Sequence, residues 1–152
     1  MWEGLAPLGR RADGGYDRFA WTPADLACRD WFVRQAAARD LAVEQDRNGN
    51  LWAWWGHDPG ADGPPAGAVA TGSHLDSVPA GGAFDGPLGV VGAFLALDAL
   101  RERHGARPPR PVAVCDFADE EGARFGVACL GSRLSTGALD PARARARRDA
   151  DG

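Results

Sequence analysis

The sequence predicts an α/β fold, and three observations support that prediction. Short apolar runs at residues 68–71 and 111–117 are typical of strands that are covered on both faces. The segment between them, residues 88–103, has the apolar spacing of a helix. Strand, helix and strand in this order form a βαβ unit, in which the two strands are parallel and the crossover is right-handed. The apolar positions of the predicted helix include Val91, Leu95 and Leu100.

The N-terminal part of the chain is predicted to contribute one helix. Residues 1–20 are rich in Gly, Arg and Asp and show little periodicity, so we expect a poorly ordered lead-in over this range. A helix start follows, in which Thr22 is the N-cap, Pro23 the first helical residue and Asp25 an acid in the first turn. The helix is expected to run to about Arg39. Its predicted inner stripe consists of Ala24, Ala27, Cys28 and Trp31.

A hairpin and a surface loop connect this helix to the βαβ unit. Residues 41–46 and 51–55 are strand-like, and the Asn48-Gly49 pair between them is a strong hairpin signal. Residues 56–67 are rich in Gly and Pro and are predicted to form a surface connection.

Composition and charge exclude several classes of protein. The formal net charge of −4 argues against nucleic acid as the main partner. No apolar run approaches the ~18 residues of a membrane span and no secretory signal begins the chain, so no membrane contact and a cytoplasmic location are expected. The cysteines lack any CxxC spacing and are predicted to be reduced and mostly buried apolar residues. They are Cys28, Cys115 and Cys129.

The loops that follow the two parallel strands hold residues with metal-binding chemistry. One loop begins near residue 72 and the other near residue 118. Because the carboxyl ends of parallel strands meet at one edge of a sheet, where ligands bind, these loops are expected to converge. The histidine and the acidic residues of these two loops are His74, Asp76, Asp119, Glu120 and Glu121.

Each of these side chains also has a structural interpretation. A neutral imidazole is the commonest protein ligand for zinc. The carboxylate of Asp76 is near enough in sequence to fix the tautomer of His74. An isolated histidine, however, is more often a surface residue or a residue whose hydrogen bonds are satisfied within the fold. Asp85 precedes Pro87 and an apolar helix, so it is equally suited to be an N-cap. The two roles are compatible, because a helix N-terminus stabilises the ionised carboxylate that a metal needs.

The adjacent Glu120 and Glu121 follow an apolar strand without an evident basic partner in the sequence. Two carboxylates in one cleft repel each other and raise at least one pKa, unless a cation lies between them. A solvated acidic turn is the simpler interpretation of this pair alone. A binuclear metal site resolves the repulsion, because one glutamate ligates a metal while its neighbour takes a proton from a water.

The joint pattern resembles a known family. Residues 71–86, 120–126 and 130–133 resemble the N-carbamoyl-L-amino-acid hydrolases. That group includes β-ureidopropionase and allantoate amidohydrolase, and it is part of a clan of dinuclear zinc-type metallopeptidases and aminoacylases. The Gly-Gly-x-Phe-Asp-Gly and Glu-Glu-Gly-x-Arg-Phe forms of the motifs are typical of the carbamoylase branch.

This resemblance implies a role for each site residue. His74 would ligate one metal, and Asp76 would hold its ring. Asp85 would bridge two metals, and Glu121 would ligate the second. Glu120 would be the general base that deprotonates the attacking water. The implied reaction is the hydrolysis of an N-carbamoyl-L-amino acid, a linear ureido compound, to the amino acid, CO2 and ammonia.

The resemblance also implies the fold, the cofactors and the assembly. The fold would be a three-layer α/β/α catalytic domain of the zinc-peptidase type with a mixed, largely parallel sheet. Residues 21–152 would be the N-terminal portion of that domain. The cofactors would be two divalent metal ions, zinc or manganese, with cobalt or nickel as alternatives. The substrate would be a small ureido or amide molecule, and the full-length protein would be a homodimer.

The number of ligands departs from the family pattern. Two metals that share one aspartate need about five protein ligands, and this chain offers three. His57 in the Gly/Pro loop and His104 at the end of the crossover helix are poorly placed, and the family's two further histidines come later in the chain. We therefore expect this chain alone to bind metals weakly and to hydrolyse little or nothing. The alternatives are an allantoate amidohydrolase, an aminoacylase or dipeptidase of the same clan, and an inert fragment.

Overall fold

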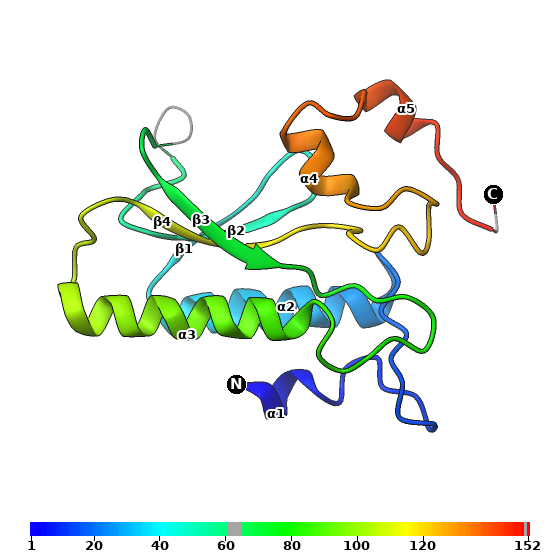
Figure 1. Cartoon of the computed structure of the whole chain (residues 1–152), viewed down its shortest axis with the longest axis horizontal. Coiled ribbons are helices and arrows are strands. Elements are labelled where there is room, and N and C mark those ends of the chain that lie inside the picture. Colours follow the sequence, from blue (N-terminus) through cyan, green and yellow to red (C-terminus); the bar gives the residue numbers. More distant parts are fainter. Residues whose placement is uncertain (61–64, 151) are drawn as a thin grey trace.

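One four-stranded sheet and two long helices make up most of the fold (Figure 1). The computed structural model describes residues 1–60, 65–150 and 152. The predicted α/β fold class is confirmed. In chain order the elements are α1 (Trp2–Leu5), α2 (Pro23–Ala37), β1 (Ala42–Gln45), β2 (Leu51–Trp55), β3 (Val69–Ser73), α3 (Pro87–His104), β4 (Val112–Asp116), α4 (Leu130–Ser135) and α5 (Pro141–Arg145).

The strand order in the sheet is β1-β2-β4-β3. β1 pairs with β2 and β2 pairs with β4 in antiparallel fashion, whereas β3 and β4 are parallel. β3, α3 and β4 therefore form the predicted βαβ unit. A largely parallel sheet is predicted, but β3 and β4 are the only parallel pair among the described residues. The pair ends in register, with Ser73 opposite Asp116, so the two loops that follow start side by side.

The predicted hairpin joins β1 to β2. The Asp46 carboxylate accepts hydrogen bonds from the peptide N–H groups of Asn48 and Asn50, at 2.8 and 3.0 Å. Gly49 has a φ of +89°, a conformation that glycine adopts without a steric penalty. The turn thus has the chemistry that the Asn-Gly pair predicts. The surface connection predicted at residues 56–67 lies partly outside the described residues, at 61–64.

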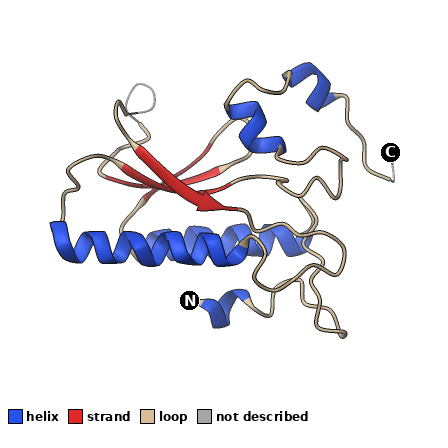
Figure 2. Cartoon of the chain, viewed as in Figure 1, coloured by secondary structure: helices blue, strands red, loops and turns tan. Residues whose placement is uncertain are grey.

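The core lies between the sheet and the two long helices, α2 and α3, which cover the same face of the sheet (Figures 1 and 2). The ring of Phe94 on α3 packs against Trp31 and Phe32 on α2, with ring centroids 6.4 and 5.2 Å apart. Ala53 of β2 and Val114 of β4 are fully buried in the same cluster. This packing fixes α3 beneath the two strands whose loops carry the predicted site.

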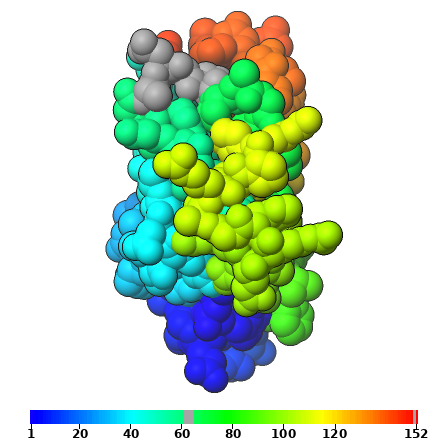
Figure 3. All heavy atoms as spheres, turned by 90° about the vertical axis from the view of Figure 1, so that its left-hand side faces the viewer, coloured from blue at the N-terminus to red at the C-terminus, as the bar shows by residue number. Residues whose placement is uncertain are grey.

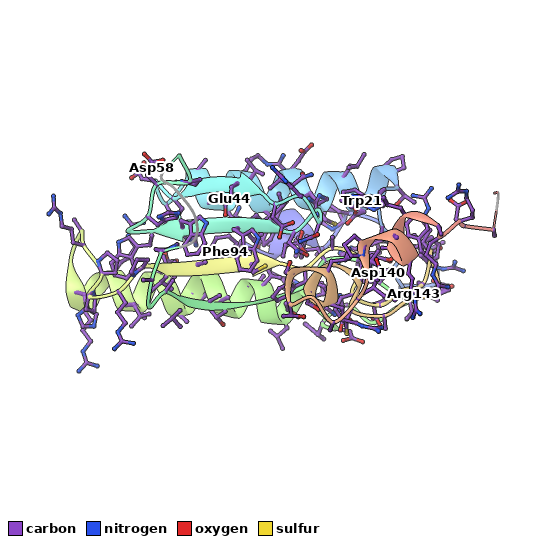
Figure 4. All side chains as sticks on the ribbon, turned by 90° about the horizontal axis from the view of Figure 1, so that it is seen from above. Trp21, Glu44, Asp58, Phe94, Asp140 and Arg143 are labelled. Carbon is purple, nitrogen blue, oxygen red and sulfur yellow. The ribbon has the colours of Figure 1, made fainter. Side chains whose placement is uncertain are left out.

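The third layer of the predicted α/β/α arrangement is short within the described residues. Among the described residues, only the short helices α4 and α5 lie on that side, and α4 lies near one end of the sheet (Figures 1 and 4). β3 is an edge strand, and Val69 is 50% exposed. The prediction that residues 68–71 form a strand covered on both faces is therefore wrong. An apolar run does not reveal whether another layer covers each face of the strand.

α3 buries a different stripe from the predicted one. Val91 is buried, but Leu95 and Leu100 are 55% and 39% exposed, and Phe94 and Leu97 are buried instead. The helix is apolar on most of its surface, so its periodicity does not distinguish the two stripes. Even so, no helix in the part of the chain that the structure describes is long and apolar enough to cross a membrane.

Residues 1–20 pack against the rest of the chain, which differs from the poorly ordered lead-in that the composition predicts. Arg18 is only 2% exposed, and its guanidinium donates hydrogen bonds to the carbonyl oxygens of Leu5 and Leu8 and lies over the ring of Tyr16. These contacts leave no periodic signal in the sequence. This N-terminal segment forms one end of the molecule, and α4 and α5 lie at the other (Figure 3).

Candidate metal centre

The ends of β3 and β4 bring the predicted site residues together. The peptide N–H of Phe117 donates a hydrogen bond to the carbonyl oxygen of Ser73 at 2.8 Å, which extends the parallel pairing by one step. His74 follows directly on β3. The segment that contains Glu120 and Glu121 follows β4 in the neighbouring loop. The sheet therefore places both predicted loops at one edge, as the βαβ topology requires.

Three predicted metal ligands converge on one point. One ligand atom each from His74, Asp85 and Glu121 lies within 4.8 Å of the others. They come from the loop after β3, the turn before α3 and the loop after β4. One imidazole and two carboxylates form a donor set that suits zinc or manganese. The residues present thus fit a divalent cation, although their roles as ligands stay a prediction.

The orientation of the His74 ring follows from its partner. Nδ1 lies 3.0 Å from the carbonyl oxygen of Asp76, and because a carbonyl only accepts, Nδ1 carries the proton. In the neutral ring, which is the form that binds a metal, Nε2 then presents a lone pair. Burial opposes a charged ring, but the hydrogen bond to Asp76 and the charges of Asp76 and Glu120 raise the pKa of His74 to about 9. Surroundings that favour a proton on this ring also favour a cation beside it.

Asp76 does more than the sequence predicts. Its carboxylate lies 3.5 Å from Nδ1 of His74, but the hydrogen bond to the ring is made by the backbone carbonyl of Asp76, so the predicted role of the carboxylate in holding the ring stays a prediction. In addition, Oδ1 accepts the peptide N–H of Glu120 and Oδ2 accepts the peptide N–H of Glu121, both at 3.1 Å. Asp76 is itself only 3% exposed. One buried carboxylate thus fixes the segment after β4 that contains Glu120 and Glu121 (the Glu loop) relative to His74.

The two adjacent glutamates occupy different environments. Glu121 belongs to the group of three predicted ligands formed with His74 and Asp85 (the ligand group). Partial burial and the negative charges of Asp85, Glu120 and Asp76 raise its pKa, against the opposing effect of His74. Beside burial, the repulsion among these carboxylates contributes to the shift, and a cation between them would relieve it. Glu120 instead directs one carboxylate oxygen to the thiol of Cys129.

Asp85 is not the N-cap of α3. The N-cap is Gly86, with Pro87 as the first helical residue, and no side chain caps the helix. The capping interpretation of Asp85 is therefore wrong. Asp85 is exposed and its carboxylate joins the ligand group.

The other two histidines do not take part in the ligand group. His57 packs edge-on against the ring of Trp54, and His104 is the last residue of α3, next to the start of β3. That neither residue serves the centre stays a prediction.

Asp119 is a buried group that the sequence interpretation left without a role. It is 2% exposed, and within the described residues neither of its carboxylate oxygens has a hydrogen-bond partner. Burial, with the nearby charges of Asp76 and Asp25, raises its pKa to about 7. Its backbone has a φ of +49° and its carbonyl accepts the peptide N–H of Leu130, which ties the Glu loop to α4.

Comparison with known proteins finds relatives along the whole chain. An N-carbamoyl-L-amino acid amidohydrolase of Geobacillus stearothermophilus is 39% identical over 100% of the chain and 36% of its own length. An allantoate amidohydrolase of Escherichia coli is 36% identical over 97% of the chain and 35% of its own length. A ureidoglycolate hydrolase of Arabidopsis thaliana is 40% identical over 84% of the chain and 26% of its own length. No protein-family model matches the chain.

Solved structures of similar proteins also match the chain along nearly its whole length. A hydantoinase/carbamoylase family amidase from Burkholderia ambifaria matches with a TM-score of 0.86 and 37% identity, over 99% of this chain and 36% of that one. The chain thus spans between about a quarter and somewhat over a third of the length of the relatives that it matches.

Proposed function

We propose that this chain is part of an amidase of the hydantoinase/carbamoylase family, and that the protein that carries it hydrolyses carbon–nitrogen bonds other than peptide bonds in ureido compounds, as the similarity to such proteins supports. The leading substrate is an N-carbamoyl-L-amino acid, which would yield the amino acid, CO2 and ammonia. The observation that carries this proposal is the convergence of His74, Asp85 and Glu121 within 4.8 Å, with Glu120 beside them.

We propose that the cofactors are two divalent metal ions, zinc or manganese, with cobalt or nickel as alternatives. The chemistry of the donor set supports this. Burial and then the charges of Asp85, Glu120 and Asp76 raise the pKa of Glu121, and a cation would neutralise those charges. His74 would bind through Nε2, because Nδ1 is engaged with Asp76. A bound cation would supply Lewis acidity toward the ureido carbonyl.

We assign the proton transfers of the reaction to Glu120. Its carboxylate lies at the ligand group, with Oε2 at 3.4 Å from Nε2 of His74, yet it is not a member of that group. In the proposed reaction Glu120 takes a proton from the attacking water and passes it to the departing nitrogen. Asp76 holds both the ring of His74 and the peptide groups of the Glu loop, so that these atoms keep their relative positions.

An allantoate amidohydrolase is the second candidate function, and similarity to such enzymes favours it to nearly the same degree. The similarity to ureidoglycolate hydrolases extends the set to a third ureido substrate. An aminoacylase or dipeptidase is the remaining alternative. For the full-length protein we further propose a cytoplasmic location, a small-molecule substrate and a homodimer, all of which follow from the family.

A substrate panel on the full-length protein that carries this chain tests the proposal. Ammonia release is measured with N-carbamoyl-L-amino acids, N-carbamoyl-β-alanine, allantoate, ureidoglycolate and dipeptides, with added Zn²⁺ or Mn²⁺. The Glu120→Gln variant is the control for contaminating activity. We expect ammonia from at least one ureido compound, with N-carbamoyl-L-amino acids turned over fastest. Cleavage of dipeptides alone, or no turnover of any ureido compound, would overturn the proposal.

A further inference from the structure

Cys129 contacts the proposed general base in two ways. Its thiol donates a hydrogen bond to Oε1 of Glu120 at 3.3 Å, and its peptide N–H donates to the carbonyl oxygen of Glu120. Cys129 is the N-cap of α4 and has a φ of +58°, a left-handed conformation that is uncommon for a residue with a side chain. The chain therefore turns at this point in a way that brings the thiol to the carboxylate.

The second oxygen of Glu120 has a different neighbour. Oε2 lies 3.4 Å from Nε2 of His74, while Oε1 lies at the thiol of Cys129. The Glu120 carboxylate is thus held between the thiol and the imidazole. Its neighbour Glu121 has no such thiol contact among the described residues and lies in the ligand group.

We propose that Cys129 is a positioning residue. Its thiol holds the Glu120 carboxylate next to the ligand group, so that this carboxylate does not itself become a ligand. This proposal rests on the proposed function, because it takes Glu120 to be the general base. It explains why two adjacent glutamates on one loop serve different purposes. Glu121 is free to bind a cation, whereas Glu120 is retained for proton transfer.

The other two cysteines make this thiol experimentally distinguishable. Cys28 and Cys115 are fully buried, and burial raises the pKa of both thiols, to about 12 for Cys28. Cys129 is only partly buried. The hydrogen bond to Glu120, followed by burial and the charge of Glu120, raises its pKa, while Arg133 opposes the shift. Because the thiolate is the reactive form, alkylation of Cys129 reports directly on its contact with Glu120.

The first test measures the rate of Cys129 alkylation by iodoacetamide in this chain, with the modified peptide identified by mass spectrometry. Glu120→Gln removes the negative acceptor, so we expect alkylation several-fold faster than in wild type at the same pH. Glu102→Gln, on the last turn of α3 and exposed, is the matched control and should leave the rate unchanged. Equal rates in wild type and Glu120→Gln would overturn the contact. This readout needs no turnover, so it stands even if the substrate panel fails.

The second test compares Cys129→Ala and Cys129→Ser in the full-length protein. Loss of one hydrogen bond to a charged group is expected to lower kcat about three- to tenfold in the alanine variant, with KM within about twofold of wild type. The serine variant keeps a donor and should recover most of that loss. Metal-induced thermal stabilisation should be the same in all three proteins. An unchanged kcat in Cys129→Ala, or an equal loss in Cys129→Ser, would overturn the positioning role.

Discussion

Oδ2 of Asp76 accepts the peptide N–H of Glu121 at 3.1 Å, across 45 residues of sequence. The other oxygen, Oδ1, accepts the neighbouring peptide N–H, that of Glu120, so one buried carboxylate holds two consecutive backbone groups. The loops after β3 and β4 are thereby locked together at the point where the ligand group forms. Asp76 is consequently as much a part of the proposed centre as the ligands themselves.

Substitution of Asp76 should weaken both the fold and the metal centre. Asp76→Ala removes two hydrogen bonds to a charged acceptor, which we expect to lower the free energy of unfolding by about 3 kcal/mol. Metal affinity should fall at least tenfold, as judged by calorimetry. Asp76→Asn keeps one acceptor oxygen and should lie between alanine and wild type. Asp13→Asn, at an exposed carboxylate, is the control. Wild-type affinity in Asp76→Ala would contradict the positioning role.

Gly86 is expected to be intolerant of a side chain. It has a φ of +80°, and a Cβ there would lie 2.5 Å from Cε1 and 2.6 Å from Nδ1 of His74. Gly86→Ala should therefore displace the imidazole and reduce metal-induced thermal stabilisation to near zero. Gly82→Ala is the matched control, because no atom lies within 4 Å of its added Cβ. Equal metal responses in the two variants would show that the ring is not held where the structure has it.

The two glutamates should respond differently to loss of charge. In the full-length protein, Glu120→Gln is expected to lower turnover by about 10²- to 10⁴-fold while metal content stays near that of wild type. Glu121→Gln should lower metal affinity itself, because a ligand is lost. Metal content is measured by elemental analysis after dialysis, beside the ammonia assay. If Glu120→Gln loses metal and Glu121→Gln keeps it, the two roles are exchanged.

Asp25 should make stability depend on pH. Burial raises its pKa to about 6, against the hydrogen bond from the peptide N–H of Trp21 and the charge of Arg29. Between pH 4 and 6 the folded chain then keeps a proton that the unfolded chain has lost. The resulting stabilisation is present at low pH and is lost as the pH rises through 6.

Asn cannot titrate but keeps the acceptor oxygen, so Asp25→Asn should lack this pH dependence. Urea unfolding at pH 4, 5, 6 and 7 measures the free energy of unfolding of both proteins. The advantage of wild type over Asp25→Asn should decline by about 2 to 3 kcal/mol over that range. A difference that is constant with pH would show that Asp25 titrates at its ordinary value in the fold.

Local signals in the sequence predict much of this fold. The Asn48-Gly49 turn, the start of α2 at Pro23 and the extent of β2 are all determined by residues close in sequence, and the structure confirms them. The convergence of His74 with Asp85 and Glu121 follows from topology, because parallel strands end at one edge.

Features that depend on distant partners could not be predicted. The packing of Arg18 on the carbonyl oxygens of α1 and its neighbours involves backbone groups, which carry no residue-specific pattern. The hold of Asp76 on the Glu loop is of the same kind. The exposure of β3 depends on which elements pack on its faces, and the local apolar run does not show this. The contact of Cys129 with Glu120 depends on one left-handed residue, and the pattern indicated only a buried apolar cysteine.

His74, Asp85 and Glu121 are proposed to bind a divalent cation together. Calorimetric titration of this chain with Zn²⁺ and with Mn²⁺, for wild type and Asp85→Ala, tests this proposal most directly, with Asp58→Ala in the exposed loop as the control. We expect measurable binding to wild type and to Asp58→Ala, and affinity at least tenfold weaker for Asp85→Ala. Equal affinities for wild type and Asp85→Ala would contradict the proposal.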